Sequence, residues 1–370
     1  MSNGRYISIL NEIKKNGGDS YSNNPNEKVL IIDGLNTFIR VFSVIPTTND
    51  DGIHVGGIVG FLKSVGYAIK MLAPTRTIIV FDGKGGSNRR RKLYPEYKAK
   101  RTTKIRLNRV NDFENIEDER HSMMMQLSRC AEYLEKLPVN IVSVDSVEAD
   151  DVMAYIAKQL LPKSKTTIMS TDKDFLQLVS DRISVWSPTK KKLYNPEKVL
   201  EEYKVTSKNL LLSRIFEGDQ SDNIKGVMGI GVKTLLKNFP QLADENVVMT
   251  RDDVIKEAQN HKGDRFYDLI NDGVDTIHRN HKLMQLQEVD ISGNAKLKIN
   301  NIVNGKIPEL SKPNFQKMFI EDRMFGALPN MDSWIMQTWT KLNRFAKINN
   351  GTKAVSYTHP EPTRRYRISY

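Results

Sequence analysis

Four short, largely apolar runs are the sequence feature that most constrains the fold of this chain. They are separated by stretches of helical periodicity, and they cover residues 29–32, 77–81, 140–144 and 166–170. Runs of this length and character are typical of parallel strands that are buried on both faces. Strands that alternate with helices predict a mostly parallel central sheet with right-handed crossovers. We therefore expect an α/β fold with helices flanking the sheet, and residues 183–186 are a candidate fifth strand.

Carboxylates follow these runs where each predicted strand ends. Asp33 and Asp82 stand directly after the first two runs, Glu148-Ala149-Asp150-Asp151 follows the third, and Asp172-Lys173-Asp174 follows the fourth. The carboxyl ends of parallel strands lie at one edge of a sheet, where such folds bind ligands. Carboxylates held close together raise one another's pKa unless a hard cation such as Mg²⁺ neutralises them. Together the motifs predict a metal site, although a solvated acidic loop would explain each motif taken alone.

The composition is that of a globular protein. The chain has 370 residues, of which 39% are hydrophobic and 27% are charged, so it suffices for one large domain or two. No apolar run approaches the roughly 20 residues of a membrane-spanning helix, and residues 1–28 lack the apolar core of a signal peptide. A single cysteine, Cys130, excludes an internal disulfide. We expect a cytoplasmic protein without membrane contact, with residues 1–28 as a flexible leader.

An internal basic segment carries most of the net charge of +12. Residues 84–109 contain eleven Lys or Arg residues and one acid, Glu96. Tyrosines lie among these cations, and aromatic rings beside cations suit stacking on unpaired bases next to phosphate contacts. A solvated loop is the alternative, but the position between two structured regions favours a nucleic-acid surface. The candidate contact residues are Lys84, Arg89, Arg90, Arg91, Lys92, Tyr94, Tyr97, Lys98 and Arg101.

A second candidate for phosphate binding lies in residues 217–238. Asp219 and Asp222 precede a glycine-rich turn that leads into a helical pattern. Such a turn can present bare backbone N–H groups and a helix N-terminus to a phosphate. An ordinary glycine turn before a helix is the alternative. The candidate contact residues here are Lys225, Gly229, Gly231, Lys233 and Thr234.

In combination, these motifs resemble those of the flap endonuclease and 5′→3′ exonuclease family, which includes the 5′-nuclease domain of bacterial DNA polymerase I. Within that family, the chain is most similar to the ribonuclease H group of T-even-type bacteriophages. The resemblance runs from residue 29 to about residue 238 and continues more weakly toward residue 347. It rests on Asp33-Gly34, Phe81-Asp82-Gly83-Lys84, Pro95-Glu96-Tyr97-Lys98, Glu148-Ala149-Asp150-Asp151, Thr171-Asp172-Lys173-Asp174-Phe175, Gly218-Asp219-Gln220-Ser221-Asp222-Asn223 and Gly229-Ile230-Gly231. Lys225 and Met228 depart from the pattern, because relatives often have proline there.

The resemblance implies a PIN-like 5′-nuclease fold that holds two Mg²⁺ ions, which Mn²⁺ can replace. Residues 84–112 would form a helical arch for a single-stranded 5′ end, with Lys98 at the scissile phosphate. Residues 217–238 would form a helix–hairpin–helix element that grips duplex phosphates, with K⁺ bound near residues 229–231 as in many relatives. The implied metal ligands, direct or through water, are Asp33, Asp82, Glu148, Asp150, Asp151, Asp172, Asp174, Asp219 and Asp222.

For the whole chain, the resemblance implies a 5′ nuclease with ribonuclease H activity that removes RNA primers during phage DNA replication. Its substrate would be a DNA duplex, or an RNA–DNA duplex, with a 5′ end or flap. We expect a catalytic domain at residues 29–187, a helical C-terminal domain at 188–347 and a disordered tail at 348–370. We also expect a monomer, with a single-stranded-DNA-binding protein as its protein partner.

Two other functions fit parts of the pattern. A catalytically silent scaffold could bind branched DNA, but it would lack some carboxylates, and every acidic motif position is filled here. A PIN-type ribonuclease could use the same acid-edged sheet, but it would need neither the basic segment nor the glycine turn. The sequence leaves open the preference between RNA and DNA, because that choice depends on contacts to the 2′-OH. It also leaves open the balance of exonucleolytic and endonucleolytic cutting.

Overall fold

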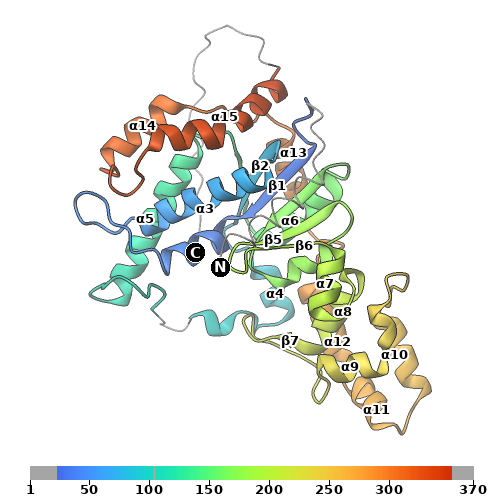
Figure 1. Ribbon diagram of the computed structural model, residues 1–370. Helices are drawn as coiled ribbons and strands as arrows, with labels where there is room; N and C mark the ends of the chain where they lie inside the picture. Colours follow the sequence, from blue (N-terminus) through green and yellow to red (C-terminus); the bar gives the residue numbers. More distant parts are fainter. Residues whose placement is uncertain (1–22, 103–105, 352–370) are drawn as a thin grey trace, which may run out of the picture.

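A six-stranded sheet forms the centre of the molecule in the computed structural model, which describes residues 23–102 and 106–351 (Figure 1). The strand order is β3-β2-β1-β4-β5-β6, and every neighbouring pair is parallel except β5 and β6. This arrangement confirms the predicted α/β fold and the candidate fifth strand. The strands are β1 (Lys28–Asp33), β2 (Arg76–Asp82), β3 (Asn140–Val144), β4 (Lys165–Met169), β5 (Ile183–Ser187) and β6 (Lys192–Tyr194).

The central strands are buried on both faces, and they end at one edge of the sheet. Leu30 and Ile32 of β1 contribute to the core on one face, whereas Val29 and Ile31 contribute to the core on the other. In the strand register, Asp82 at the end of β2 pairs with Val144, the last residue of β3. Asp33 at the end of β1 pairs with Val80 of β2, two residues before Asp82. The carboxylates that end or follow β1 to β4 are therefore delivered to the same edge.

Helices from both halves of the chain cover the first of these faces. Phe38 and Phe61 share one core with Phe315 and Trp339, although nearly 300 residues separate the two groups in sequence. The prediction assigned residues 188–347 to one C-terminal domain. Within this range, the last two helices bury apolar side chains against the N-terminal half, and the final helix ends at Asn349, inside the predicted tail. The helices on this face are α2 (Gly34–Phe42), α3 (Gly56–Leu72), α5 (Ile116–Leu134), α14 (Lys312–Glu321) and α15 (Met331–Asn349).

The second face is covered by helices that follow β3, β4 and β6. Val152, Ile215 and Ile299 pack there with Val29 and Ile31 in one core. These helices are α6 (Ala149–Tyr155), the π-helical η2 (Ile156–Leu160), the 3₁₀ helix η3 (Lys173–Leu178), α7 (Pro196–Tyr203), α8 (Ser207–Glu217) and α13 (Gly293–Val303).

A helical lobe lies beyond α8, at the lower right of Figure 1. It starts with a short antiparallel hairpin, β7 and β8, which carries the predicted acids Asp219 and Asp222. The elements of the lobe are β7 (Gly218–Asp219), β8 (Ile224–Lys225), α9 (Val232–Asn238), η4 (Pro240–Ala243), α10 (Arg251–Asn260), α11 (Arg265–Asp272) and α12 (Val274–Met284).

The basic segment between β2 and α5 contains two short helices among its described residues, α4 (Asn88–Leu93) and η1 (Ala99–Thr102). It contacts the β7–β8 hairpin, because the backbone N–H of Lys98 donates to the carbonyl of Asp222 at 2.9 Å and the Asn223 side chain donates to the carbonyl of Glu96 at 2.9 Å. The predicted arch corresponds to this segment, but residues 103–105 and the Arg101 side chain lie outside the described part.

Most of the predicted leader and tail lie outside the described residues, which begin at residue 23 and end at residue 351. Within that range, none of the helices combines the length and the apolar character needed to cross a membrane.

A buried arginine anchors α13 to the edge of the sheet opposite the acids. Arg76, the first residue of β2, is 2% exposed. Its guanidinium donates to the Asn140 side chain on β3 at 2.8 and 3.1 Å, to the Asn26 side chain at 2.8 Å, and to the carbonyl of Val303 at the end of α13. Burial lowers the pKa of Arg76 to about 10. None of the carboxylates in residues 23–102 and 106–351 forms an ion pair with it, so neutral oxygens alone hold this charge.

We expect Arg76→Met to lower the free energy of unfolding by about 2–4 kcal/mol, because it leaves two buried oxygens without their donors. Urea denaturation followed by circular dichroism measures the change. Arg344→Met is the matched control, because Arg344 is exposed and donates to the Asn23 side chain at 3.1 Å. Its effect should stay below about 0.5 kcal/mol. Equal effects of the two substitutions would contradict the anchoring role of Arg76.

Candidate active site

Backbone geometry fixes the two carboxylates that end the central strands. Asp33 ends β1 and caps α2, where its Oδ1 accepts the backbone N–H of Asn36 at 3.0 Å and its Oδ2 accepts the Ser170 hydroxyl at 3.1 Å. Asp82 ends β2, and its Oδ1 accepts the backbone N–H of Ala149 at 2.7 Å. This last bond joins the end of β2 to the start of α6, so Asp82 lies beside the Glu148 motif.

The other carboxylates at this edge stand at the starts of helices. Glu148 immediately precedes α6, and Asp150 lies in its first turn, where the positive end of the helix dipole favours negative charge. Asp172 caps η3, and its Oδ1 accepts the backbone N–H of Asp174 at 2.8 Å. Each of the strands β1 to β4 is thus followed by a helix, and the acids lie at or near these junctions.

Four of these side chains form what we call the first acid group, Asp33, Asp82, Asp150 and Asp172. Burial raises the pKa of Asp33 to about 7, and the charges of Asp82 and Asp172 contribute to the rise. Burial also raises the pKa of Asp150, again with contributions from Asp172 and Asp33. Charges that affect one another in this way are close together, so the structure brings acids from β1, β2, α6 and η3 into one cluster, in which Asp33 is buried and the other three are half-buried.

The β7–β8 hairpin brings more distant acids to the same cluster. We call Asp174, Asp219 and Asp222 the second acid group. Burial and the neighbouring charge of Asp172 raise the pKa of Asp174 to about 7. Burial raises the pKa of Asp172 as well, and the charges of Asp222 and Asp219 add to it. The two acid groups therefore meet at Asp172, although about 40 residues separate η3 from the hairpin in sequence.

The donor set fits hard divalent cations, but the side chains do not form a finished coordination shell. All members of the two acid groups are aspartates, and carboxylate oxygens are ligands that Mg²⁺ and Mn²⁺ prefer. Among the residues that the structure describes, no set of three or more candidate ligands is arranged to hold a metal ion. Coordination of an ion by three or more of these carboxylates would therefore require rotation of their side chains.

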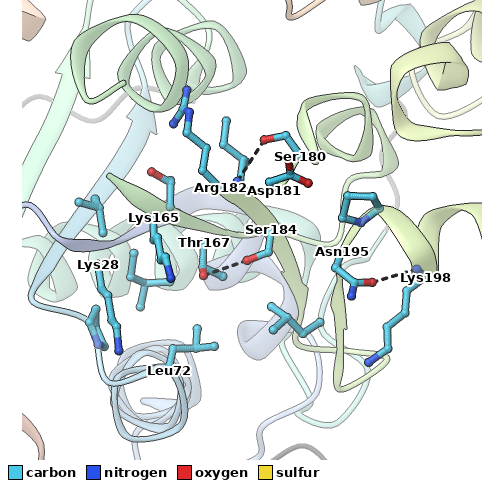
Figure 2. Close-up of a pocket in the computed structure, with 17 residues that line it drawn as sticks. Lys28, Leu72, Lys165, Thr167, Ser180, Asp181, Arg182, Ser184, Asn195 and Lys198 are labelled. Carbon is cyan, nitrogen blue, oxygen red and sulfur yellow. Dashed lines mark hydrogen bonds between the residues drawn. The ribbon is translucent and has the colours of Figure 1, made fainter. Parts of the chain in front are cut away.

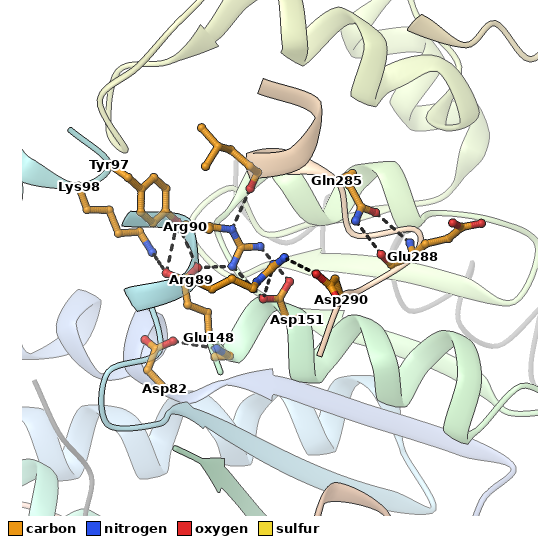
Figure 3. Close-up of polar contacts among 12 residues, drawn as sticks. Asp82, Arg89, Arg90, Tyr97, Lys98, Glu148, Asp151, Gln285, Glu288 and Asp290 are labelled. Atoms are coloured by element: carbon orange, nitrogen blue, oxygen red, sulfur yellow. Dashed lines mark hydrogen bonds and ion pairs between the residues drawn. The ribbon is translucent and has the colours of Figure 1, made fainter. Parts of the chain in front are cut away.

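A buried arginine from the basic segment lies among the acids of α6. Arg90 on α4 is 3% exposed, and its guanidinium donates to both oxygens of Asp151 at 2.8 Å and to Glu148 (Figure 3). It also donates to the carbonyl of Leu283 in α12 at 2.8 Å. The Arg90 guanidinium is therefore bound by two carboxylates and one backbone carbonyl. Through these contacts it connects α4 with α6 and with the helical lobe.

Lys98 and Tyr97 complete the contacts of Glu148. The ammonium group of Lys98 lies 2.5 Å from Oε1 of Glu148, and the Tyr97 hydroxyl donates to both carboxylate oxygens at 3.3 Å (Figure 3). Burial would raise the pKa of Glu148, but the charges of Arg90 and Lys98 outweigh it and lower the pKa below its ordinary value. Glu148 is therefore ionised and engaged by cations from the basic segment.

These contacts change the roles predicted for four residues. Arg90 and Tyr97 were predicted to contact nucleic acid, but both are buried and face Glu148. Asp151 was predicted to bind metal, but Arg90 engages both of its oxygens. Glu148 could join an ion only by exchanging its present partners. The physical reason is the same for all four, because a buried carboxylate is stabilised by nearby positive or hydrogen-bond-donating side chains.

The other candidate contact residues lie at the surface or at its margin. Lys84, Arg91 and Lys92 are exposed, and so are Lys225, Gly229, Gly231, Lys233 and Thr234 around the glycine turn. Arg89 is half-buried, and it contacts Asp151 at 3.3 Å and Asp290 at 3.6 Å. Tyr94 lies under the Arg279 guanidinium, 4.7 Å from the ring centre.

Sequence reasoning missed Arg214, which is buried among the second acid group. It contacts Asp174, Asp219 and Glu217. A single arginine at the end of an apolar helical pattern does not indicate contact with acids. The periodicity of a helix predicts which face is buried, but not which residues pack against that face.

A cavity of about 460 Å³ lies away from the acids (Figure 2). It opens where β1 and β4 begin, and its lining includes Lys28, Lys165 and Lys198, with the hydroxyls of Thr167 and Ser184 3.1 Å apart. No member of either acid group lines it. The chemistry of the acid edge is therefore separate from this cavity.

The sequence is similar to known 5′-3′ exonucleases. Residues 28–204 match the family model of the 5′-3′ exonuclease N-terminal resolvase-like domain. The 5′-3′ exonuclease of Buchnera aphidicola subsp. Acyrthosiphon pisum is 30% identical over 213 residues, covering 57% of this chain and 69% of that protein. The 5′-3′ exonuclease of Bacillus subtilis is 30% identical over 221 residues, with the same coverage of both chains. A thermostable DNA polymerase I of Thermus thermophilus is 33% identical over 236 residues, covering 63% of this chain and 26% of that protein.

Solved structures share the fold at lower identity. A bacteriophage T5 flap endonuclease, in a pseudo-enzyme–product complex with DNA and metal ions, matches with a TM-score of 0.58 at 21% identity, covering 80% of this chain and 99% of that chain. The T5 5′-exonuclease with bound zinc matches with a TM-score of 0.56 at 20% identity, covering 80% and 98%. These structures share the fold, and the sequence similarity places the chain in the 5′-3′ exonuclease family.

Proposed function

We propose that this chain is a metal-dependent nuclease that hydrolyses phosphodiesters near the 5′ ends of duplexes. The observation that carries the proposal is the crowding of the two acid groups at one edge of the sheet, where burial and mutual repulsion raise the pKa of Asp33, Asp150 and Asp174. A protein interior tolerates such a concentration of negative charge best when it serves to bind positive charge. Membership of the 5′-3′ exonuclease family supports the same reaction.

The two acid groups would hold two Mg²⁺ ions, for which Mn²⁺ could substitute. A bound pair of such ions lowers the pKa of a water and stabilises charge on the leaving oxygen of a phosphodiester. The first acid group would position one ion, and the second acid group would hold the other, either directly or through water. The carboxylates then act as ligands and need not transfer protons. The T5 exonuclease solved with zinc supports a divalent-metal site in this fold.

Lys98 is the side chain that we assign to the reacting phosphate. Its backbone has a φ of 56°, a conformation that lysine rarely adopts, and the N–H bond to Asp222 holds it there. Lys98 thus contacts the hairpin through its backbone and Glu148 at the acid edge through its ammonium group. On substrate binding it would exchange Glu148 for the phosphate and offset the charge that develops during the reaction. Hydrolysis would leave a 5′ phosphate and a 3′ hydroxyl.

Nucleic acid would approach across the outward-facing part of the basic segment and the glycine turn. Lys84, Arg91 and Lys92 are exposed on the first. On the second, Gly229 has a φ of +80°, so the turn can bring bare backbone close to a duplex phosphate, with K⁺ as a candidate bridging ion near residues 229–231. The T5 flap endonuclease complex with DNA supports a duplex with a 5′ flap as the substrate.

The specific biological role that we propose is removal of RNA primers during phage DNA replication, with ribonuclease H activity. It is supported by the resemblance of the motifs to the ribonuclease H group, and a single-stranded-DNA-binding protein would be the partner of a monomeric enzyme. The alternative of a silent DNA-binding scaffold is disfavoured because all nine predicted acids are present and clustered. A PIN-type ribonuclease would not require the glycine turn.

We expect Asp150→Asn to reduce cleavage of a labelled 5′-flap duplex in Mg²⁺ by at least about 100-fold, because it removes a carboxylate from the first acid group. Parallel assays on matched RNA–DNA and DNA–DNA duplexes and on a free RNA hairpin rank the substrates. Asp290→Asn is the control, because Asp290 is an exposed acid beside Arg89. This variant should cleave the duplex at the wild-type rate. Undiminished cleavage by Asp150→Asn, or full cleavage in EDTA, would refute the proposal.

The metal-free protein should lose stability as the pH rises, because the pKa of Asp33 is about 7 in the folded state and near 3.8 in the unfolded chain. Between these two pH values the folded state binds more protons than the unfolded chain. The loss of stability caused by ionising Asp33 is therefore absent below pH 3.8 and complete above pH 7. Asp33→Asn removes it and retains a capping oxygen. Its stability advantage over wild type in EDTA should grow between pH 5 and 8 by up to roughly 2–3 kcal/mol.

Urea denaturation at the two pH values measures this difference. Asp112→Asn, at an exposed position, is the control and should give no pH-dependent advantage. If the Asp33→Asn advantage is the same at pH 5 and pH 8, the crowding of charge around Asp33 is not as described. Added Mg²⁺ should recover more stability for wild type at pH 8 than at pH 5.

A further inference from the structure

Arg214 is a second buried arginine among acids, and nothing in the proposed mechanism yet uses it. It stands in the last turn of α8 and is 8% exposed. The next two residues, Ile215 and Phe216, are packed in the core of the second sheet face. Core packing therefore fixes the end of α8, and with it the point from which the guanidinium extends toward the second acid group.

The guanidinium bridges carboxylates from separate parts of the chain. Its Nε lies 3.1 Å from Oδ1 of Asp174 on η3, and one terminal nitrogen lies 2.6 Å from Oδ2 of Asp219 on the hairpin. The other terminal nitrogen lies 2.9 Å from Oε2 of Glu217 and 3.3 Å from the carbonyl oxygen of Gly218. Every nitrogen of the planar fork has a partner, a span that a lysine ammonium cannot reproduce.

These contacts leave the two aspartates in different states. Asp219 is fully engaged, because its Oδ1 also accepts the N–H and hydroxyl of Ser221, each at 2.7 Å, and the N–H of Asp222 at 3.3 Å. For Asp174, the hydrogen bonds and ion pairs among the described residues involve Oδ1 alone. Its Oδ2 is therefore the carboxylate oxygen that remains open, and its direction is set by the bond from Arg214 to Oδ1.

We propose that Arg214 is the positioning residue of the second acid group, which holds Asp174 ready for the second divalent ion and uses Asp219 as its own anchor. The inference rests on the proposed two-ion function and deepens it. Groups that orient metal ligands without touching the metal typically change metal affinity 10–100-fold when removed. Among the described residues, Arg214 forms ion pairs with Asp174 and Asp219 of the second acid group and with no member of the first. Its charge also lowers the pKa of Asp172, but without contact, so its removal should weaken one ion far more than the other.

The test is a titration of the full chain with Mn²⁺ in the absence of DNA. Electron paramagnetic resonance measures the Mn²⁺ that remains free. Wild type should bind two ions. Arg214→Gln should weaken one of the two affinities by about 10–100-fold and leave the other within about threefold. The Mg²⁺ concentration for half-maximal flap cleavage should rise in parallel.

Two further variants separate positioning from general stability. Arg129→Gln is the matched control, because Arg129 also contacts three carboxylates, Glu132, Glu321 and Asp322, but does so between α5 and α14. It should lower thermal stability and leave both Mn²⁺ affinities unchanged. Arg214→Lys keeps the charge and should still weaken the same site, and it carries the test if Arg214→Gln does not fold.

Three results would overturn the inference: Mn²⁺ affinities of Arg214→Gln equal to those of wild type, equal weakening of both sites, or tighter binding at the second site. The last would mean that Arg214 acts only by repelling the ion. A wild-type protein that binds no Mn²⁺ would overturn the proposed function as well. Two sites with unchanged affinities in Arg214→Gln would overturn this inference alone.

Discussion

Repulsion among buried carboxylates is the constraint on which the rest of this structure depends. Parallel strands bring Asp33 and Asp82 to one edge, and the helices that follow β3 and β4 add Asp150 and Asp172. Without counter-charge, such a cluster opposes folding. The chain offsets part of it with Arg90, Lys98 and Arg214, which come from outside the sheet. Around Asp33 and Asp150, burial and the neighbouring carboxylates still raise the pKa of both side chains.

The counter-charges also explain how distant segments are held together at the site. Arg90 joins α4 to α6 and, through the carbonyl of Leu283, to the helical lobe. Lys98 joins the basic segment to Glu148 and to the β7–β8 hairpin. Arg214 joins α8 and the hairpin to η3. Each of these cations thus connects an element that carries acids at the sheet edge with an element from another part of the chain.

The basic segment divides its charge between two tasks. Arg90 points inward and is neutralised by acids, whereas its neighbours Arg91 and Lys92 point outward and are exposed. A short helix makes this division possible, because adjacent residues on a helix face different directions. The net charge of the segment therefore overstates what is available to nucleic acid. The opposite edge of the sheet has a different character, since Arg76 is held there by neutral oxygens and serves to anchor α13.

The sequence by itself determined the sheet, the helices that flank it and the edge at which the acids gather. Apolar runs that end in Asp33 and Asp82 suffice for that, because strand direction and burial follow from local pattern. It could not separate Arg90 from Arg91, or Asp151 from Asp150, because a charged residue in a motif looks the same whether it faces metal, substrate or another side chain. Nor could it find Arg214 or the return of α15 to the sheet. Both depend on which surfaces meet once the chain has folded, and only the tertiary structure decides which charge lies opposite which.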